Sequence, residues 1–198
     1  FQHGLADIVV GMDDLAFIDG LWADWSPGFD GAEDIAHVKD SLRDPANLAA
    51  AIGKSPIALA QRGLSVADQT EVLALMTPLG TPEWIGEGLF DAVTALAGSG
   101  PAFVYRFIDA LAAGAATLGL PADQAERLAL AMVEGAGALA SASPHSPGEL
   151  ARRVASPGGT TQAGLDAIDA GDALNRLVSA TLKAAADRSA EMAAAARG

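Results

Sequence analysis

The sequence predicts an all-α domain over residues 54–198, preceded by a short segment of different composition. Three observations support this fold class. Apolar residues beyond position 54 recur at three- and four-residue spacing, which is the period of one helix face. Glycine and proline divide this range into stretches of helical length. No stretch alternates strand-type and helix-type patterns, as an α/β sheet would require.

Residues that favour a helix start or a helix stop define the ends of the expected helices. Pro101 fits the first turn of a helix, where its missing N–H costs nothing. Gly119 and Gly171 follow helices as C-terminal stops, and Asp172 caps the last and longest helix. The expected helices cover 66–79, 89–97, 101–118, 122–142, 147–154, 160–170 and 172–196.

Residues 1–53 differ in composition and are expected to form a separate, acidic segment of uncertain fold. Residues 1–55 contain ten acidic and three basic residues, and so carry about half of the net charge of −13. Apolar spacing predicts helices over 13–25 and 33–43, and an apolar run at 8–10 favours a strand. The predicted division is therefore 1–53 and 54–198.

Composition excludes several classes of protein. A net charge of −13 opposes binding to nucleic-acid phosphates. The chain has no Cys and three isolated His residues, so neither thiol chemistry nor a metal site is expected. The longest stretches without Asp, Glu, Lys or Arg have 14 residues, too few to cross a membrane. Because Phe1 is not Met and no basic leader follows it, we expect a cytoplasmic chain that is part of a longer reading frame.

The scarcity of large side chains predicts association with a second copy. Aromatic residues make up 5% of the chain, and the helices of 54–198 are rich in Ala and Gly. Such helix faces bury little apolar area, at roughly 25 cal/mol per Å². We therefore expect an obligate homodimer with extensive interleaving of helices.

The segment 156–161, Ser-Pro-Gly-Gly-Thr-Thr, is the leading candidate for a ligand site. Its two glycines allow a ligand to approach the backbone closely. It enters a helix N-terminus, where free N–H groups and the helix dipole favour an anion, and its hydroxyl groups add donors. The combination suits a small carboxylate, whereas the alternative interpretation is a plain loop with a Thr N-cap. The residues concerned are Ser156, Gly158, Gly159, Thr160 and Thr161.

A second candidate is the small-residue segment 94–101, Thr-Ala-Leu-Ala-Gly-Ser-Gly-Pro, at the junction of two expected helices. Alone it is typical of an interhelical corner, but together with 156–161 it could line one flat pocket. Other chemistry has no motif in the sequence. There is no Gly-x-Gly-x-x-Gly turn after a strand, no Gly-x-x-x-x-Gly-Lys-Ser/Thr loop and no Gly-x-Ser-x-Gly elbow.

Three blocks of sequence resemble pyrroline-5-carboxylate reductase. They are Phe-Asp-Ala-Val-Thr-Ala-Leu-Ala-Gly-Ser-Gly-Pro-Ala-Phe at 90–103, Leu-Gly-Leu-Pro at 118–121, and Val-Ala-Ser-Pro-Gly-Gly-Thr-Thr-Gln-Ala-Gly-Leu at 154–165. The resemblance extends over about 52–198. It implies the all-α dimerisation and substrate-binding domain of that family, in which two protomers interleave and dimers can stack into rings.

The resemblance also implies roles for individual residues. The family reaction transfers a hydride from NADPH or NADH to the cyclic C=N of pyrroline-5-carboxylate, which gives L-proline. Thr94 would be the catalytic residue, beside the substrate ring and the nicotinamide. The residues that would hold the substrate carboxylate are Ser156, Gly158, Gly159, Thr160 and Thr161, and those that would line the cofactor side are Gly98, Ser99, Gly100 and Pro101.

Two regions depart from the family pattern. An acidic residue expected near position 144 or 145 is replaced in the Ser-Pro-His-Ser of 143–146, so these positions supply no acid for a hydrogen bond to the ring nitrogen. The family's Rossmann domain is not recognisable in 1–53, where the run 12–28 resembles a helical segment of an α/β-hydrolase. The difference in 1–53 predicts a composite chain, in which this segment and the helical domain have separate origins.

These observations favour the C-terminal domain of a pyrroline-5-carboxylate reductase. We expect it to be inactive alone and to bind no nicotinamide cofactor tightly, because no dinucleotide-binding domain is recognisable. The alternative is a non-enzymatic homodimerisation module that carries an unrelated N-terminal segment. A third interpretation, hydrolysis, rests on 1–53 alone and has no nucleophile motif to support it.

Overall fold

The chain divides into two compact units, Phe1–Phe90 with Met192–Gly198, and Asp91–Glu191. The structure, a computed structural model, describes residues 54–195 and seven earlier positions: Ala16, Asp19, Ile35, Ala36, Lys39, Asp40 and Arg43. Of these earlier positions, all but Arg43 are helical, and the Lys39 ammonium donates to Asp19 at 2.9 Å. The strand expected at 8–10 and the other positions of the two expected N-terminal helices lie outside the described residues.

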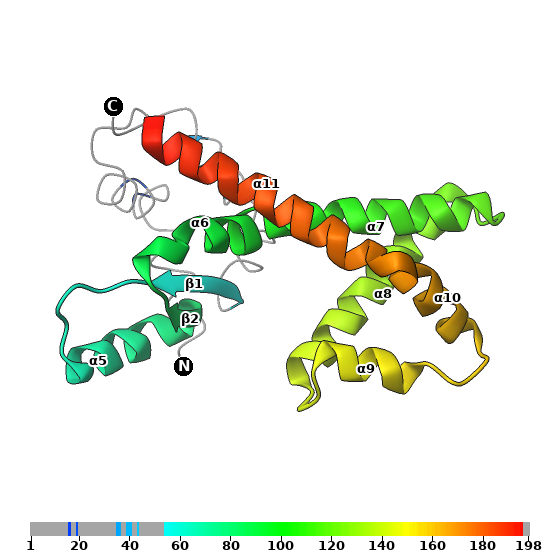
Figure 1. The fold of residues 1–198 in the computed structure, drawn as a ribbon, viewed down its shortest axis with the longest axis horizontal. Helices are drawn as coiled ribbons and strands as arrows, with labels where there is room; N and C mark the ends of the chain where they lie inside the picture. The colour runs from blue at the N-terminus through cyan, green and yellow to red at the C-terminus, as the bar shows by residue number, and fades with distance from the viewer. Residues whose placement is uncertain are drawn as a thin grey trace. The chain divides into compact units, whose positions relative to one another are not determined.

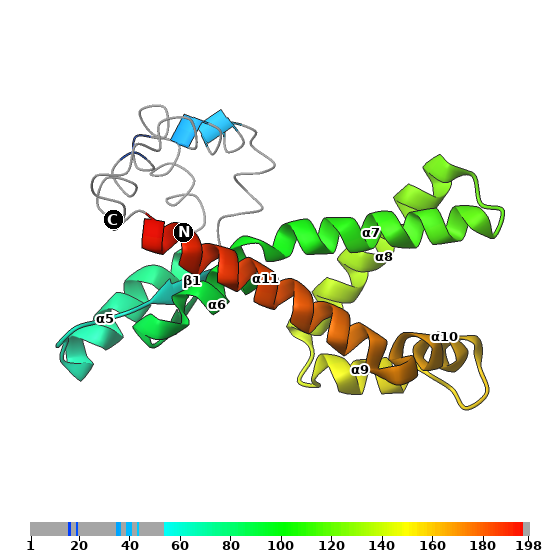
Figure 2. The same cartoon turned by 45° about the horizontal axis from the view of Figure 1, so that its top comes forward.

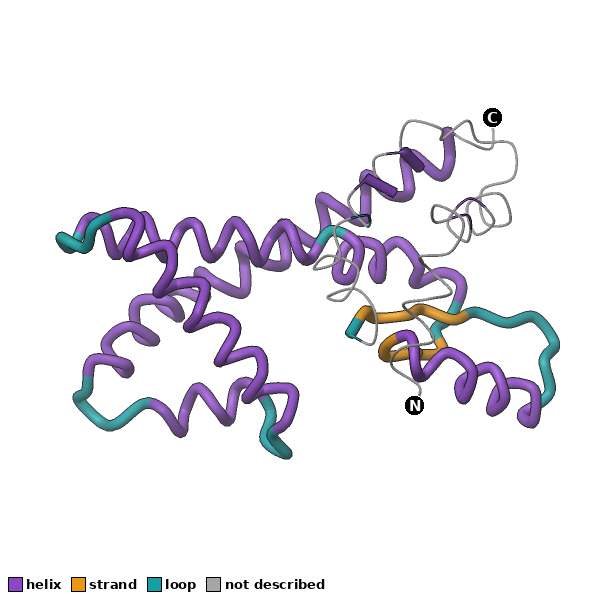
Figure 3. The backbone as a smooth tube through the Cα atoms, turned by 180° about the vertical axis from the view of Figure 1, so that it is seen from behind, coloured by secondary structure: helices purple, strands orange, loops and turns teal. Residues whose placement is uncertain are grey.

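The described part of the first unit contains a β-α-β unit (Figure 3). Strands β1 (Ser55–Leu59) and β2 (Gly80–Trp84) pair in parallel. Helix α5 (Val66–Met76), extended by the 3₁₀ turn Thr77–Leu79, supplies the crossover that a parallel pair requires. A capping box starts α5, because the Asp68 amide donates to Ser65 Oγ and the Ser65 amide donates to Asp68 Oδ2, each at 3.2 Å.

The mainly helical fold class is confirmed, and these two strands are an exception to the expected all-α content. The sequence did not indicate these strands because they contain Pro56, Gly80 and Pro82, and glycine and proline are depleted from strand interiors. Gly80 is nevertheless required for the pairing. A β-carbon at this position would lie 2.1 Å from the carbonyl oxygen of Ser55, so no larger residue fits the register.

The second unit is helical (Figure 1). The bounds of α8 (Ala122–Ala142) and α9 (Pro147–Val154) agree with the sequence prediction. Those of α7 (Gly100–Thr117) and α11 (Ala173–Ala195) differ from it by one residue at each end. Gly119, Gly171 and Asp172 have φ values of +102°, +57° and +59°, and this left-handed backbone ends the preceding helices. In order, the elements are α6 (Phe90–Val93), a π-helical turn (Thr94–Gly98), α7 (Gly100–Thr117), α8 (Ala122–Ala142), α9 (Pro147–Val154), α10 (Thr160–Asp169), a 3₁₀ turn (Ala170–Asp172) and α11 (Ala173–Ala195).

The core of the second unit is thin. Helix α8 folds back against α7, and its Ala125 and Ala129 are 1% and 8% exposed. Ala95 is the third buried apolar residue among those described, and no large side chain in the described part of the chain is fully buried. Apolar side chains instead line the outer helix faces. Exposed examples are Val104, Tyr105, Phe107, Leu128, Leu130, Met132, Leu139, Leu177 and Val178.

Candidate functional site

The segment 156–159 forms a tight turn that delivers the chain into α10. The Gly159 amide donates to the Ser156 carbonyl at 2.9 Å. Pro157 occupies the second position of the turn and Gly158 the third, where φ is +70°. These are the residues that a type II turn favours, because proline presets its own φ and glycine accepts a positive one.

Position 159 requires glycine because the Ser156 side chain folds over it. A β-carbon at Gly159 would lie 2.4 Å from Ser156 Oγ and 3.1 Å from the Ser156 carbonyl oxygen. Any larger residue at 159 would therefore push the Ser156 hydroxyl away from the start of α10. The two adjacent glycines thus have different functions: Gly158 allows the backbone conformation, and Gly159 leaves space.

Within the described part of the chain, no side chain caps the N-terminus of α10. Gly159 is the N-cap residue, and the first backbone bond of the helix runs from the Ala163 amide to the Gly159 carbonyl at 3.1 Å. The amides of Thr160, Thr161 and Gln162 therefore have no acceptor within the helix. Both threonine side chains are exposed. Three free donors at the positive end of a helix dipole provide a suitable position for a carboxylate.

Helix α9 brings a net positive charge to the residues just before this turn. Glu149 accepts from Arg152 Nη2 at 2.7 Å and from Arg153 Nε at 3.0 Å. These two hydrogen bonds, together with the charge of Arg152, lower the pKa of the Glu149 carboxyl. One carboxylate and two guanidinium groups leave one excess positive charge, which favours an anion at the turn.

The segment 94–101 forms a helical transition where a corner was expected. The Ser99 amide donates to the Thr94 carbonyl at 2.9 Å, which is the i to i+5 bond of a π-helical turn. Pro101, in the first turn of α7, explains the widening, because it has no N–H and its ring would clash with the Ala97 carbonyl in a regular helix. The Thr94 side chain is exposed, whereas Ala95 is 1% exposed. The turn therefore presents the Thr94 side chain to solvent.

One protomer does not bring the two candidate segments together. Asp91, at the start of α6, accepts a hydrogen bond from Ser189 near the end of α11, whereas the turn 156–159 leads through α10 to the beginning of α11. Residues 173 and 189 are roughly 24 Å apart along the axis of α11, at 1.5 Å per residue. Figure 2 shows α9 and α10 at one end of α11 and α6 toward the other.

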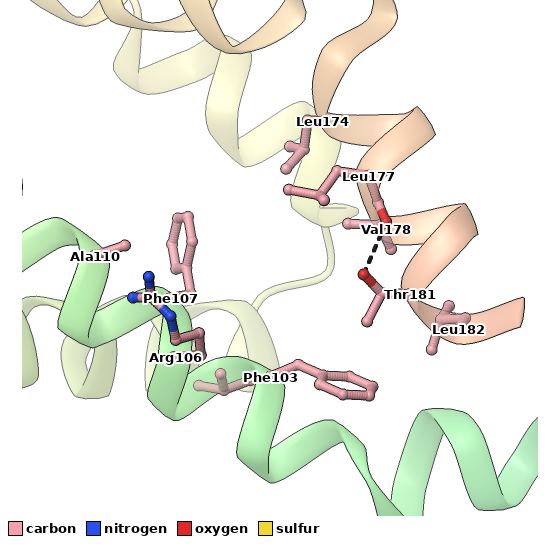
Figure 4. Close-up of a pocket in the computed structure, with 10 residues that line it drawn as sticks. Phe103, Arg106, Phe107, Ala110, Leu174, Leu177, Val178, Thr181 and Leu182 are labelled. Atoms are coloured by element: carbon pink, nitrogen blue, oxygen red, sulfur yellow. Dashed lines mark hydrogen bonds between the residues drawn. The ribbon is translucent and has the colours of Figure 1, made fainter. Parts of the chain in front are cut away.

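Between α7 and α11 lies an open apolar groove with a volume of ≈ 710 Å³ (Figure 4). Phe103 and Phe107 line it from α7, and Leu177 lines it from α11. The Thr181 hydroxyl has no proton left to donate to a ligand, because Oγ1 donates to the Leu177 carbonyl at 2.9 Å. The groove has the character of an interaction surface. It was missed as such in the sequence, although its residues recur there at helical spacing.

Among the described residues, no group of three His, Asp or Glu side chains is placed to hold a metal ion. No helix in this part of the chain is both long and apolar enough to span a membrane.

Comparison with known proteins identifies the class of this helical domain. Residues 87–192 match the family described as pyrroline-5-carboxylate reductase dimerisation. The pyrroline-5-carboxylate reductase of Aquifex aeolicus is 44% identical over 128 residues, which are 64% of this chain and 48% of that protein. The structure of a pyrroline-5-carboxylate reductase from Coxiella burnetii has a TM-score of 0.63 and 30% identity, over 69% of this chain and 51% of that one. The structure of the Plasmodium falciparum pyrroline carboxylate reductase with NADP bound has a TM-score of 0.56 and 26% identity, over 68% of this chain and 55% of that one.

The chain belongs to the pyrroline-5-carboxylate reductase dimerisation family, and the resemblance based on the three sequence blocks is confirmed. It spans about half the length of the curated relatives that it matches. The family match begins at residue 87 and lends no support to a composite chain. The α/β-hydrolase resemblance of 12–28 and the division at residue 53 remain predictions.

Proposed function

We propose that this chain is the dimerisation and substrate-binding part of a pyrroline-5-carboxylate reductase, which converts pyrroline-5-carboxylate to L-proline. The observation that carries the proposal is the turn 156–159 together with the uncapped start of α10. Three amides without helical acceptors converge there beside a hydroxyl group. Substrate and product each carry one carboxylate, which is the group that this arrangement suits.

In this proposal, the turn holds the carboxylate and fixes the orientation of the ring. The amides of Thr160 and Thr161 donate to the carboxylate oxygens, and Ser156 adds its hydroxyl group. Hydrogen bonds to an ionised acceptor are about twice as strong as neutral ones, so a few of them suffice to orient a small ligand. Gly158 and Gly159 keep side chains away from the approach.

Thr94 and the segment 98–101 supply the other side of the proposed site. The Thr94 hydroxyl makes no hydrogen bond to another described residue, so it is available to the ring nitrogen of the substrate. A bound NADPH or NADH supplies a hydride. Gly98, Ser99, Gly100 and Pro101 fit the flat nicotinamide end of such a cofactor, because a β-carbon at Gly100 would meet no atom within 4 Å.

Dimerisation completes the proposed site. The groove between α7 and α11 and the exposed faces of α8 would be covered by a second copy, as the family's name suggests. Because Thr94 and the turn 156–159 lie at opposite ends of α11, we place the turn of one protomer beside Thr94 of its partner. Stacking of dimers into larger assemblies and a cytoplasmic location stay predictions from the sequence.

Stereospecific stabilisation by L-proline tests the proposal. A ligand that binds only the folded state stabilises it by about 2.7 kcal/mol at roughly 100 times its dissociation constant. The thermal unfolding midpoint should therefore rise more with L-proline than with D-proline, which controls for the osmolyte effect. The difference should disappear in Gly159→Ala and persist in Gly164→Ala, a control further along α10. Equal shifts for both enantiomers in the unaltered chain would contradict the proposal and favour a non-enzymatic dimerisation module.

A further inference from the structure

The π-helical turn that carries Thr94 continues into α7 on one side and has little local support on the side of α6. Helix α6 has four residues, too few for an independently stable helix. A π-helical turn is rare and is usually found inserted in a longer α-helix. Ala95 is the one buried residue of the turn, and its methyl group offers little apolar area. On the side of α6, a contact outside this helical run must therefore fix its position.

A hydrogen bond between α6 and α11 supplies this support. Ser189 Oγ donates to Asp91 Oδ1 at 2.7 Å, in a partly buried position. The two residues are 98 positions apart in sequence. Every other side-chain hydrogen bond described between residues 91 and 191 joins residues at most four positions apart. Among those described in this unit, the Ser189–Asp91 bond alone ties two distant helices together.

The position of Asp91 makes this bond relevant to Thr94. The two residues are three positions apart, so their side chains are neighbours on the helix surface. A contact that fixes Asp91 against α11 also fixes the rotation of α6 about its axis, and with it the direction of the Thr94 side chain. The bond involves an ionised acceptor, which makes it stronger than a neutral one.

We infer that Asp91 and Ser189 are positioning residues, whose hydrogen bond holds the Thr94–Gly98 turn in place for the reaction. The inference rests on the proposed function for its consequence in binding, but its structural part stands without any ligand. Neither residue touches the substrate in this account. Both act through the turn, so their loss loosens the turn and weakens ligand binding while the helices remain folded.

Hydrogen exchange of the Ser99 amide measures the structural part directly. This amide closes the π-helical turn on the Thr94 carbonyl, so its protection reports the opening of the turn. Ser189→Ala should raise its exchange rate about tenfold, equivalent to ~1.4 kcal/mol of local stability. Ser189→Thr keeps the hydroxyl and should restore slow exchange. Ser179→Ala, an exposed serine on the same helix, is the matched control and should leave the rate unchanged.

Two further variants show whether Asp91 and Ser189 act through one shared hydrogen bond. Asp91→Ala removes the bond from the other side, and the double variant should exchange no faster than the faster single variant, because both changes remove one interaction. If Asp91→Ala fails to fold, Ser189→Ala still tests the inference, because alanine is favourable within a helix and this variant should fold. Unchanged Ser99 exchange in Ser189→Ala, or equal acceleration in Ser179→Ala, would overturn the inference.

The affinity for L-proline tests the binding part of the inference in a separate measurement. Ser189→Ala should weaken stereospecific stabilisation by L-proline several-fold, and Ser189→Thr should restore it. If the unaltered chain shows no preference for L-proline, the proposed function fails while the exchange result still stands. If L-proline binds and Ser99 exchange responds but the affinity does not, the positioning role is overturned and the bond is structural only.

Discussion

Replacing Gly158 by alanine tests whether the turn before α10 depends on its backbone conformation. Gly158 has φ of +70°, and a β-carbon there would meet no atom within 4 Å, so the substitution adds conformational strain without a clash. Left-handed backbone costs an L-residue with a β-carbon roughly 1–2 kcal/mol. The reduced entropy of the unfolded chain offsets ~0.4–1 kcal/mol of this. The expected net loss is therefore about 1 kcal/mol.

Gly164→Ala is the matched control for this measurement. Gly164 lies inside α10, where a β-carbon would also meet nothing within 4 Å. Alanine in a helix interior should stabilise the chain by about 1 kcal/mol relative to glycine. Urea unfolding at one fixed protein concentration compares the two variants, and L-proline titration should show about fivefold weaker binding for Gly158→Ala alone. If the two variants were equally stable and bound L-proline equally, the reasoning about the turn would be refuted.

Three further predictions concern charge, assembly and the sheet. Because the folded state lowers the pKa of Glu149 from its ordinary value of 4.5, its ion pairs stabilise the fold above that pH and lose this effect as pH falls through the lowered pKa. The thermal unfolding midpoint of Glu149→Gln should thus lie below that of the unaltered chain at pH 7, and the two midpoints should converge in acid. A difference that stays constant with pH would contradict this. Leu177→Asp should convert a dimer to monomer in analytical ultracentrifugation, because Leu177 is 66% exposed in one protomer and lines the groove, whereas Leu118→Asp, at 89% exposure outside it, should not. Gly80→Ala should abolish hydrogen-exchange protection of β1 and β2, while Gly86→Ala, which has open space, should preserve it.

Local chemistry in the sequence was enough to predict most helix bounds. Pro121 and Ser143 flank α8, and Pro147 opens α9, so the expected ranges of both helices agree with the structure. The turn at 156–159 was equally predictable, since its conformation follows from Pro157 and Gly158 alone. In each case the residues that decide the conformation lie within a few positions of it.

Features that depend on distant residues were not predictable in this way. The register of β1 and β2 requires Gly80 to approach Ser55, and no local pattern shows this contact. The π-helical turn was expected as a corner, because Pro101 also fits the start of a new helix. The separation of Thr94 from the turn 156–159 depends on how α11 runs past both segments, which spacing along the chain does not reveal.

Mixed dimers provide the most direct test of the proposed site. Thr94→Ala and Gly159→Ala should each abolish stereospecific L-proline binding as homodimers. If the turn of one protomer meets Thr94 of its partner, a dimer that combines the two variants contains one fully intact site and one with both defects. Isolated mixed dimers, measured by calorimetry, should bind L-proline with unaltered affinity and half the stoichiometry of the unaltered dimer. Mixed dimers with no binding would contradict the proposed site, because every site would then carry one defect.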